Sequence, residues 1–194
     1  MKFSAEEMLN KYSTDTEHAI EVERVAMLIF EEVSKKLFEM SAKEREFLKT
    51  ASLLHDIGYS IEAKGHNKHS MHLIIEKGLD GFTEKETKII ACIARYHRGS
   101  LPDKNEHEYY KNLEKSERKI VKRLGGILKL ADGLNKEHER IIENIKIEYD
   151  FSNSIAKIIL ISNNKKPDIS TAIRKRDLFE IGFKCQSVIL GGNY

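Results

Sequence analysis

The stretch LeuLeuHisAspIleGly at residues 53–58 decides how this chain folds. Apolar residues precede His55 by one and two helical turns on the same side of a helix, at Phe47, Leu48 and Ala51. The pattern therefore puts a histidine, and the carboxylate of Asp56 beside it, into a core helix. Burying this pair costs several kcal/mol without a compensating partner. A divalent cation suits both ligand types, so the stretch predicts a metal site inside a helical core.

Four more polar residues interrupt apolar helical faces or helix starts in the same way. His18 precedes apolar residues by four, seven and eleven positions, and His97 follows apolar residues by four and seven. Asp132 follows apolar residues by four, eight and eleven positions, and His66 lies where a loop turns into a helix. In chain order the set is His, HisAsp, His, His, Asp, which predicts side chains that converge from distant segments.

Five short stretches carry this order of polar residues. They are ThrGluHisAla (16–19), AlaSerLeuLeuHisAspIleGlyTyrSerIle (51–61), GlyHisAsnLysHisSer (65–70), AlaArgTyrHisArgGly (94–99) and LeuLysLeuAlaAspGlyLeu (128–134). Together they resemble the HD superfamily of metal-dependent phosphohydrolases. More narrowly, the chain is similar to the C-terminal HD domain of exopolyphosphatase/guanosine pentaphosphate phosphohydrolase proteins, and the likeness continues into PheGluIleGlyPhe (179–183).

The resemblance implies a metal centre. Its implied ligands are His18, His55, Asp56, His66, His97 and Asp132. The superfamily pattern implies that His18, His55, Asp56 and Asp132 hold the first ion. Asp56 could bridge to a second ion, whose other ligands would be His66 and His97. We expect one or two divalent ions, with manganese, iron, magnesium, nickel and zinc as candidates, and the lack of thiolate ligands argues against structural zinc. Such ions lower the pKa of coordinated water and neutralise phosphate oxygens, so hydrolysis of a phosphoester or phosphoanhydride is expected.

The third histidine of the set has two candidates. In related HD sequences a histidine lies four residues before a small residue that opens the next helix, and Ser70 then selects His66. His69 is the competitor, which could instead bind substrate phosphate or donate a proton. We therefore expect catalysis from His55, Asp56 and His69. Lys68 and Arg98 flank the histidine segments and are the expected phosphate-binding cations.

Each of these residues also has a simpler interpretation. A lone histidine on an apolar face is usually a core residue bonded to a backbone carbonyl, and a lone surface cation is usually solvated. The ordered set favours the metal, although a purely structural metal stays open. We expect His107, His138 and the Lys/Arg clusters at 118–123 and 174–176 to lie on solvated surface.

Composition limits the partners. The chain has 194 residues, 40% of them hydrophobic, and a net charge of +2. No apolar run approaches the roughly 18 residues of a membrane span, and no signal-peptide region is present, so we expect a cytoplasmic protein. Cys92 and Cys185 are expected to be reduced. The expected partner is a small phosphorylated substrate or polyphosphate, without membrane or nucleic acid, and a homodimer is left open.

Helix starts are marked by the Ser/Thr-x-x-Glu capping box. The four matches are Ser4 with Glu7, Thr14 with Glu17, Ser41 with Glu44, and Thr83 with Glu86. Six or seven helices are predicted over residues 4–140. After about residue 141 the pattern changes to alternating strands at 145–150 and 156–161, a helix over 169–184 and a short strand at 187–190.

The predicted fold class is mainly α, an HD-domain helical bundle with a small C-terminal α+β appendage of antiparallel strands plus one helix. The predicted division is a helical HD domain at 1–140 and a packed subdomain at 141–194. A wholly separate second domain is not expected at this length.

Three functions are compatible with these features. The first is a metal-dependent phosphohydrolase acting on polyphosphate or a guanosine or adenosine (poly)phosphate. The second is a non-catalytic polyphosphate-binding, nucleotide-binding or regulatory HD module, since the longer related proteins have their catalytic machinery in two actin-like domains that precede the HD domain. The third is a domain in which a metal only stabilises the fold. The complete ligand set favours the enzyme.

Overall fold

A computed structural model describes residues 2–163 and 165–192, so Met1, Asn164, Asn193 and Tyr194 lie outside the described residues. The first part of the chain is helical, with α1 (Ala5–Tyr12), α2 (Thr16–Lys36), α3 (Ala42–Leu54), a 3-10 helix η1 (Ile57–Ser60), α4 (His66–Lys77), α5 (Glu84–Arg95), α6 (Glu108–Lys111) and α7 (Lys115–Leu134). The second part contains β1 (Ile142–Asp150), β2 (Ile155–Ser162), α8 (Ser170–Lys175), α9 (Asp177–Phe183) and β3 (Gln186–Gly192). The predicted fold class, mainly α with a small α+β appendage, is confirmed.

Capping boxes begin three of the predicted helices. The confirmed pairs are Ser4 with Glu7, Ser41 with Glu44, and Thr83 with Glu86. For α2 the predicted cap Thr14 is wrong, because Asp15 is the N-cap and its carboxylate accepts a 2.9 Å hydrogen bond from the His18 amide. Aspartate caps at least as well as threonine, and its charge also favours the positive end of the helix dipole. The cap therefore fixes His18 in the first turn of α2.

The helical core is built around α7. Helix α7 contacts α2, α3 and α5, and α2 also packs along α3. The side chains between them are aliphatic and almost fully buried, for example Val22, Leu48, Ile93, Leu124 and Leu128. Burial of this surface is the main force holding the bundle. Because the polar residues at the centre lie on these same apolar faces, the packing also decides where they point.

A close contact joins the HisAsp turn to α4. A Cβ on Gly58 would lie 2.0 Å from the His66 carbonyl oxygen, so only glycine allows η1 to pack this near to α4. The Ser70 hydroxyl accepts a 2.8 Å bond from the Gly58 amide and donates a 2.7 Å bond to the His55 carbonyl. These two bonds fix the positions of His55 and His66 relative to each other.

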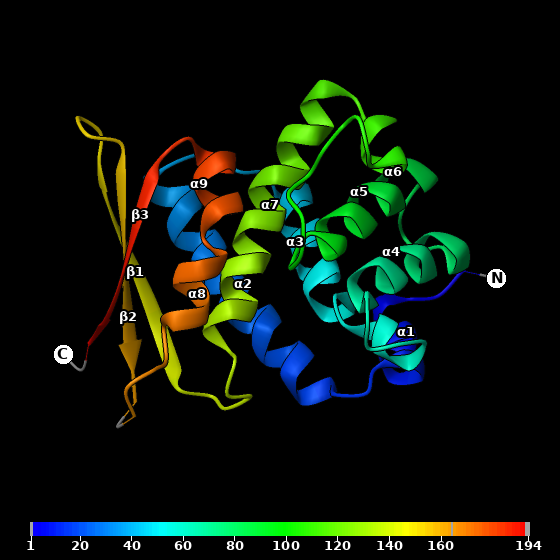
Figure 1. Cartoon of the computed structure of the whole chain (residues 1–194), viewed down its shortest axis with the longest axis horizontal. Helices are drawn as coiled ribbons and strands as arrows, with labels where there is room; N and C mark the ends of the chain where they lie inside the picture. The colour runs from blue at the N-terminus through cyan, green and yellow to red at the C-terminus, as the bar shows by residue number, and fades with distance from the viewer. Residues whose placement is uncertain (1, 164, 193–194) are drawn as a thin grey trace.

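The C-terminal sheet has the order β1-β2-β3, and it lies at one end of the molecule (Figure 1). Strands β1 and β2 are antiparallel as predicted, but β2 and β3 are parallel, so the expectation of a wholly antiparallel sheet is wrong. The reason is that α8 and α9 form a crossover between β2 and β3, and parallel neighbours require such a connection. The single helix expected over 169–184 is divided at Arg176 into α8 and α9.

Helices α8 and α9 lie between the sheet and α7 (Figure 1). Two glycines of α7 allow their close approach: a Cβ on Gly126 would lie 2.6 Å from the Phe179 Cα, and one on Gly133 would lie 2.9 Å from the Ala172 Cα. One cluster of buried apolar side chains runs through both parts of the chain. The division at residues 140 and 141 stays a prediction.

Two further sequence features are visible in the described part of the chain. Its helices include none that is both long enough and apolar enough to cross a membrane. Cys92 and Cys185 are free thiols, and both are buried. Burial raises the pKa of Cys92 to about 12 and that of Cys185 to about 11, so neither thiol is poised to react.

Candidate metal centre

Six of the predicted site residues meet around one cavity, brought there from separate elements. They are His18 in α2, His55 at the end of α3, Asp56 before η1, His66 at the start of α4, His97 just after α5, and Asp132 in α7. The cavity encloses about 480 Å³. Its lining comprises Thr14, Asp15, His18, Asp56, Tyr59, His66, His97, Arg98, Asp132, Lys136, His138, Thr171 and Lys175, while His55 is fully buried behind it.

Asp56 lies between two pairs of histidines. Its Oδ2 is 3.7 Å from His18 Nε2 and 3.4 Å from His55 Nε2. Its Oδ1 is 3.1 Å from His66 Nε2 and 3.3 Å from His97 Nε2. Each oxygen thus faces its own pair of rings, and in each group of three the potential ligand atoms lie within 4.8 Å of one another. This is the arrangement expected of a carboxylate shared between two ions.

Asp132 adds a second carboxylate to the first of these groups. Its Oδ1 is 3.4 Å from His18 Nε2 and 3.8 Å from His55 Nε2. Its Oδ2 is bonded to the ammonium group of Lys175, which comes from α8. The first group therefore offers two imidazole nitrogens and two carboxylate oxygens, a set that suits a divalent transition metal.

All four histidine rings are oriented by their other nitrogen. Each Nδ1 forms a hydrogen bond with an oxygen acceptor. The acceptors are Asn135 Oδ1 for His18 (2.8 Å), the Ser52 carbonyl for His55 (2.7 Å), the Ala63 carbonyl for His66 (3.0 Å) and the Ala94 carbonyl for His97 (2.7 Å). A carbonyl oxygen can only accept, so Nδ1 carries the proton and Nε2 keeps its lone pair. Metal-ligating histidines are held in this way, with the free nitrogen turned toward the ion.

Charges in the centre also suit a cation. Burial would raise the pKa of Asp56, but electrostatic attraction to the surrounding histidines, His55, His66 and His97, lowers it on balance. Burial likewise opposes ionisation of Asp132, yet His18 and Lys175 hold its pKa well below the usual value. Burial and the charge of His55 lower the pKa of His97 to about 3. At neutral pH the centre thus holds two ionised carboxylates and a neutral His97 ring.

Two buried atoms of the centre lack a hydrogen-bond partner among the described residues, namely His55 Nε2 and Asp56 Oδ1. Buried polar atoms are nearly always paired, so each needs an explanation. Ligand atoms around one ion with bonds of about 2.1 Å are separated by roughly 3.0–3.4 Å. Most of the separations given above are of this size or slightly longer. The residues present therefore fit a divalent ion.

Two predicted residues are not brought into the cavity. His69 Nε2 lies 3.7 Å from a carboxylate oxygen of Glu62, and Lys68 is exposed to solvent. Helix α4 begins at His66, so the residues that follow are rotated around the helix and carried along it, away from the cavity. Arg98, the other predicted phosphate-binding residue, does line the cavity.

Two aromatic side chains at the cavity were not predicted from the sequence. The Tyr59 ring stacks on His66 with centroids 3.8 Å apart, and the His138 ring stacks on His18 at 4.1 Å. His138, expected on solvated surface, is half exposed but also pairs with Asp15 at 2.8 Å. Tyr59 directly follows the HisAspIleGly stretch at residues 55–58, so its place beside the centre could have been predicted from the sequence.

The C-terminal part contributes two lining residues, Thr171 and Lys175. Lys175 was expected to be solvated with its neighbours at 174–176, and this is wrong because it is bonded to Asp132. The two residues are 43 positions apart, so periodicity within one element gives no sign of their contact. Asn135, by contrast, follows Asp132 by three positions, and helical spacing could have indicated its place beside the centre.

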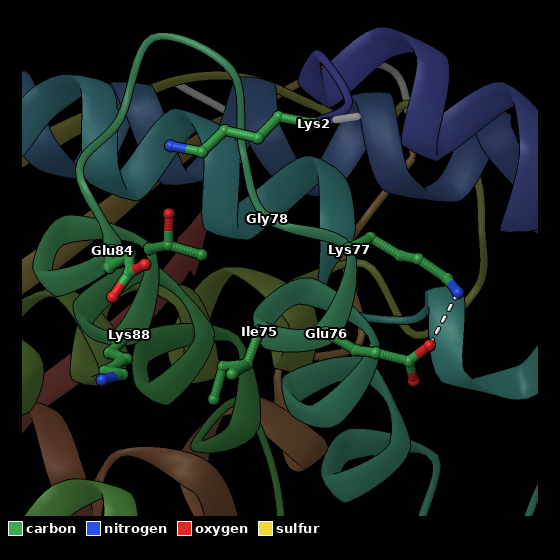
Figure 2. Close-up of a pocket in the computed structure, with 8 residues that line it drawn as sticks. Lys2, Ile75, Glu76, Lys77, Gly78, Glu84 and Lys88 are labelled. Atoms are coloured by element: carbon green, nitrogen blue, oxygen red, sulfur yellow. Dashed lines mark hydrogen bonds and ion pairs between the residues drawn. The ribbon is translucent and has the colours of Figure 1, made fainter.

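A second pocket lies at the junction of α4 and α5 and encloses about 380 Å³ (Figure 2). Its lining residues are Lys2, Ile75, Glu76, Lys77, Gly78, Glu84, Thr87 and Lys88. Glu76 and Lys77 form an ion pair of 2.7 Å at its edge. No histidine or cysteine appears in this lining, so its chemistry differs from that of the candidate metal centre.

Comparison with known protein families matches residues 2–174 to the family described as Ppx/GppA phosphatase, domain III. Three similar proteins carry the name guanosine-5'-triphosphate,3'-diphosphate pyrophosphatase. The one from Vibrio campbellii is 30% identical over 92 residues, which is 47% of this chain and 18% of the relative. Those from Pseudoalteromonas translucida and Aeromonas hydrophila are 28% identical over 93 residues and 30% identical over 90 residues, covering 48% and 46% of this chain and 19% and 18% of the relatives. The chain thus spans less than a fifth of the length of these relatives.

Proposed function

Because this chain belongs to the Ppx/GppA phosphatase, domain III family, we propose that it is a metal-dependent phosphohydrolase with a centre of the HD type. In this proposal His18, His55, Asp56 and Asp132 would hold one divalent ion. His66 and His97 would hold a second ion, with Asp56 shared between the two.

The observation that carries the proposal is the position of Asp56. Its two oxygens face two separate histidine pairs, with four separations of 3.1–3.7 Å. A core that needed no ion would gain nothing from turning four histidine lone pairs toward one carboxylate. Each ring is instead held by its Nδ1 bond, so the orientation costs little further entropy when an ion binds.

A bound divalent ion lowers the pKa of coordinated water and neutralises charge on phosphate oxygens. The side chains of the chain itself orient the substrate. Arg98 offers a planar pair of donors to a phosphate group at the wall of the cavity, and Lys136 adds a second cation. Tyr59 and His138 fix the histidine rings by stacking. The fully buried His55 keeps solvent from the inner side of the centre.

The proposed substrates contain phosphoanhydride or phosphoester bonds, with polyphosphate and guanosine or adenosine (poly)phosphates as the leading class. Support comes from the three relatives, whose name is that of a pyrophosphatase for guanosine-5'-triphosphate,3'-diphosphate. Further support comes from the cations along the cavity wall, since polyanionic substrates need several positive partners.

A second candidate function is a polyphosphate-binding or nucleotide-binding regulatory module without turnover. One observation favours it: His69, the expected proton donor, lies outside the cavity beside Glu62. The ligand set that would bind metal and phosphate is the same in both functions. They differ only in whether a bound phosphate is cleaved.

Metal analysis and a phosphate-release screen separate these functions. Protein purified without chelator is analysed for bound metal and then assayed with inorganic polyphosphate, guanosine pentaphosphate and dinucleoside polyphosphates. We expect bound divalent metal and activity that His55→Ala and Asp56→Ala abolish. The matched control is His72→Ala, because His72 is an exposed histidine that packs on Tyr109 away from the cavity.

Two outcomes would change the proposal. Activity that survives both His55→Ala and Asp56→Ala would remove the catalytic role of the centre. Tight binding of these compounds with no phosphate released would favour the regulatory module instead.

A further inference from the structure

Lys175 is bonded directly to one of the proposed metal ligands, and it comes from the C-terminal part of the chain. Its ammonium group is bonded to Asp132 Oδ2, while Asp132 Oδ1 faces His18 and His55. Lys175 lines the cavity together with Thr171, one turn earlier on the same face of α8. The match to the family ends at residue 174, so family membership assigns no role to this lysine.

The base of the Lys175 side chain is fixed by helix packing. A Cβ on Gly133, the residue after Asp132, would lie 2.9 Å from the Ala172 Cα and 3.3 Å from the Lys175 Cδ. Helix α8 is therefore docked directly beside Asp132. Only the end of the lysine side chain is free to change its partner, and about a quarter of the side chain is exposed toward the cavity.

The charges around the cavity indicate which partner the Lys175 ammonium would take after leaving Asp132. Without an ion, Lys175 is the lysine that neutralises Asp132, a largely buried carboxylate at the cavity wall. A divalent ion held by Asp56 and Asp132 would neutralise both carboxylates, leaving the Lys175 ammonium beside a cation. The remaining carboxylate of the lining, Asp15, is already bonded to the His18 amide and to His138. An anionic ligand in the cavity is the partner that remains.

We propose that Lys175 releases Asp132 when that carboxylate takes up a divalent ion, and that it then binds a phosphate oxygen of the substrate in the same cavity. This inference rests on the proposed function, because it requires a divalent ion at the first group of ligands. A lysine suits the exchange, since its ammonium carries three donors on a flexible four-carbon stem. Lys175 is thus a substrate-binding residue supplied by the appendage to a centre built by the bundle.

The test compares Lys175→Met with Lys166→Met, which removes the same charge from an exposed lysine outside the cavity lining. Calorimetry first measures binding of Mn²⁺ to each metal-free protein. The Mn²⁺-loaded proteins, freed of excess ion, are then titrated with methylenediphosphonate, which cannot be hydrolysed. We expect Lys175→Met to bind Mn²⁺ at least as tightly as the wild type and to bind methylenediphosphonate roughly tenfold more weakly, the usual loss for a charged hydrogen bond. Lys166→Met should change neither affinity.

Other results would overturn the inference. Unchanged methylenediphosphonate affinity in Lys175→Met would show that Lys175 does not bind phosphate. Weaker Mn²⁺ binding would show that its bond to Asp132 only supports the fold, and Lys175→Arg, which keeps the positive charge, should then restore Mn²⁺ binding. If the wild type itself binds no Mn²⁺, the proposed function fails instead of the lysine exchange alone.

Discussion

At the scale of single residues, Asp56 connects the two halves of the centre. It lies directly after His55, where α3 has ended and η1 has not begun, so its carboxylate is free of the helix and can turn into the cavity. The local sequence predicted that this residue would be buried beside a histidine. Helical spacing on apolar faces also indicated His18, His55, His97 and Asp132, whereas His66 was selected through the resemblance to related HD sequences.

Asp56→Asn tests this connection with little change in shape. The amide cannot supply a negative charge to either ion, so we expect both ions to be lost and phosphate release to fall by more than roughly 100-fold, beyond the range for residues that only support a ligand. Elemental analysis after dialysis against limiting Mn²⁺ measures the metal content. Retention of one ion per chain would mean that the two histidine pairs do not share Asp56.

His97 should control the response of the metal-free protein to acid. Burial and the charge of His55 lower its pKa from the usual 6.5 to about 3. Between these values the unfolded chain binds a proton that the folded chain excludes, so the free energy of unfolding rises with pH in this window and is lost on acidification. Burial lowers the pKa of His18, but its interactions with Asp132, Asn135 and Asp56 together raise it above the usual value, so His18 acts in the opposite sense.

Comparison with His97→Gln isolates the contribution of His97. Urea unfolding with chelator present, repeated from pH 4 to 7, should give a shallower dependence of stability on pH for His97→Gln than for the wild type. Equal slopes for the two proteins would mean that His97 is protonated in the folded state.

At the scale of elements, the helix starts were predictable and the pairing of the last strand was not. Capping is local, so Ser41 and Glu44 or Thr83 and Glu86 can be recognised within four residues. Strand alternation at 145–150 likewise shows which side chains are buried in β1. The alternation of side chains carries no information on the direction of a strand, which for β3 depends on the path of α8 and α9.

The close approach of η1 and α4 predicts a strong effect of one methyl group. In Gly58→Ala the new Cβ would lie 2.0 Å from the His66 carbonyl oxygen, so one of the two elements must move. We expect the free energy of unfolding to fall by about 1–3 kcal/mol or more, as for overpacked cores. We also expect weaker Mn²⁺ binding. Chemical denaturation and calorimetry measure the two effects.

Gly191→Ala is the control for this substitution, because a Cβ there would make only ordinary contacts of 3.6 Å or longer. It should alter stability by a few tenths of a kcal/mol and leave Mn²⁺ binding unchanged. A Gly58→Ala protein as stable as this control would contradict the close packing of η1 on α4.

At the scale of the whole molecule, the bundle and the appendage share one cavity. The bundle supplies the histidines and both central carboxylates, while α8 brings Lys175 and Thr171 to the wall. Sequence periodicity describes each element by itself, so it pointed to proposed ligands inside the bundle but missed these contacts between parts. It also included His69 and Lys68, because spacing alone cannot show where α4 turns away from the centre.

The buried ligand set predicts that metal binding stabilises the whole fold. An ion that binds only the folded chain, at about 100 times its dissociation constant, adds roughly 2.7 kcal/mol. For a chain of this size that corresponds to a rise in Tm of roughly 5–10 °C. Thermal unfolding with Mn²⁺ and with chelator measures this shift. The same Tm with Mn²⁺ and with chelator would argue against a buried ion.

The most direct test of the central claim is anomalous diffraction at the manganese edge from crystals grown with Mn²⁺. The proposed centre predicts a peak among His18, His55, Asp132 and Asp56 Oδ2, and a second beside Asp56 Oδ1, His66 and His97. A map with no anomalous density next to Asp56, from a protein folded as described, would contradict the metal centre on which the proposed function depends.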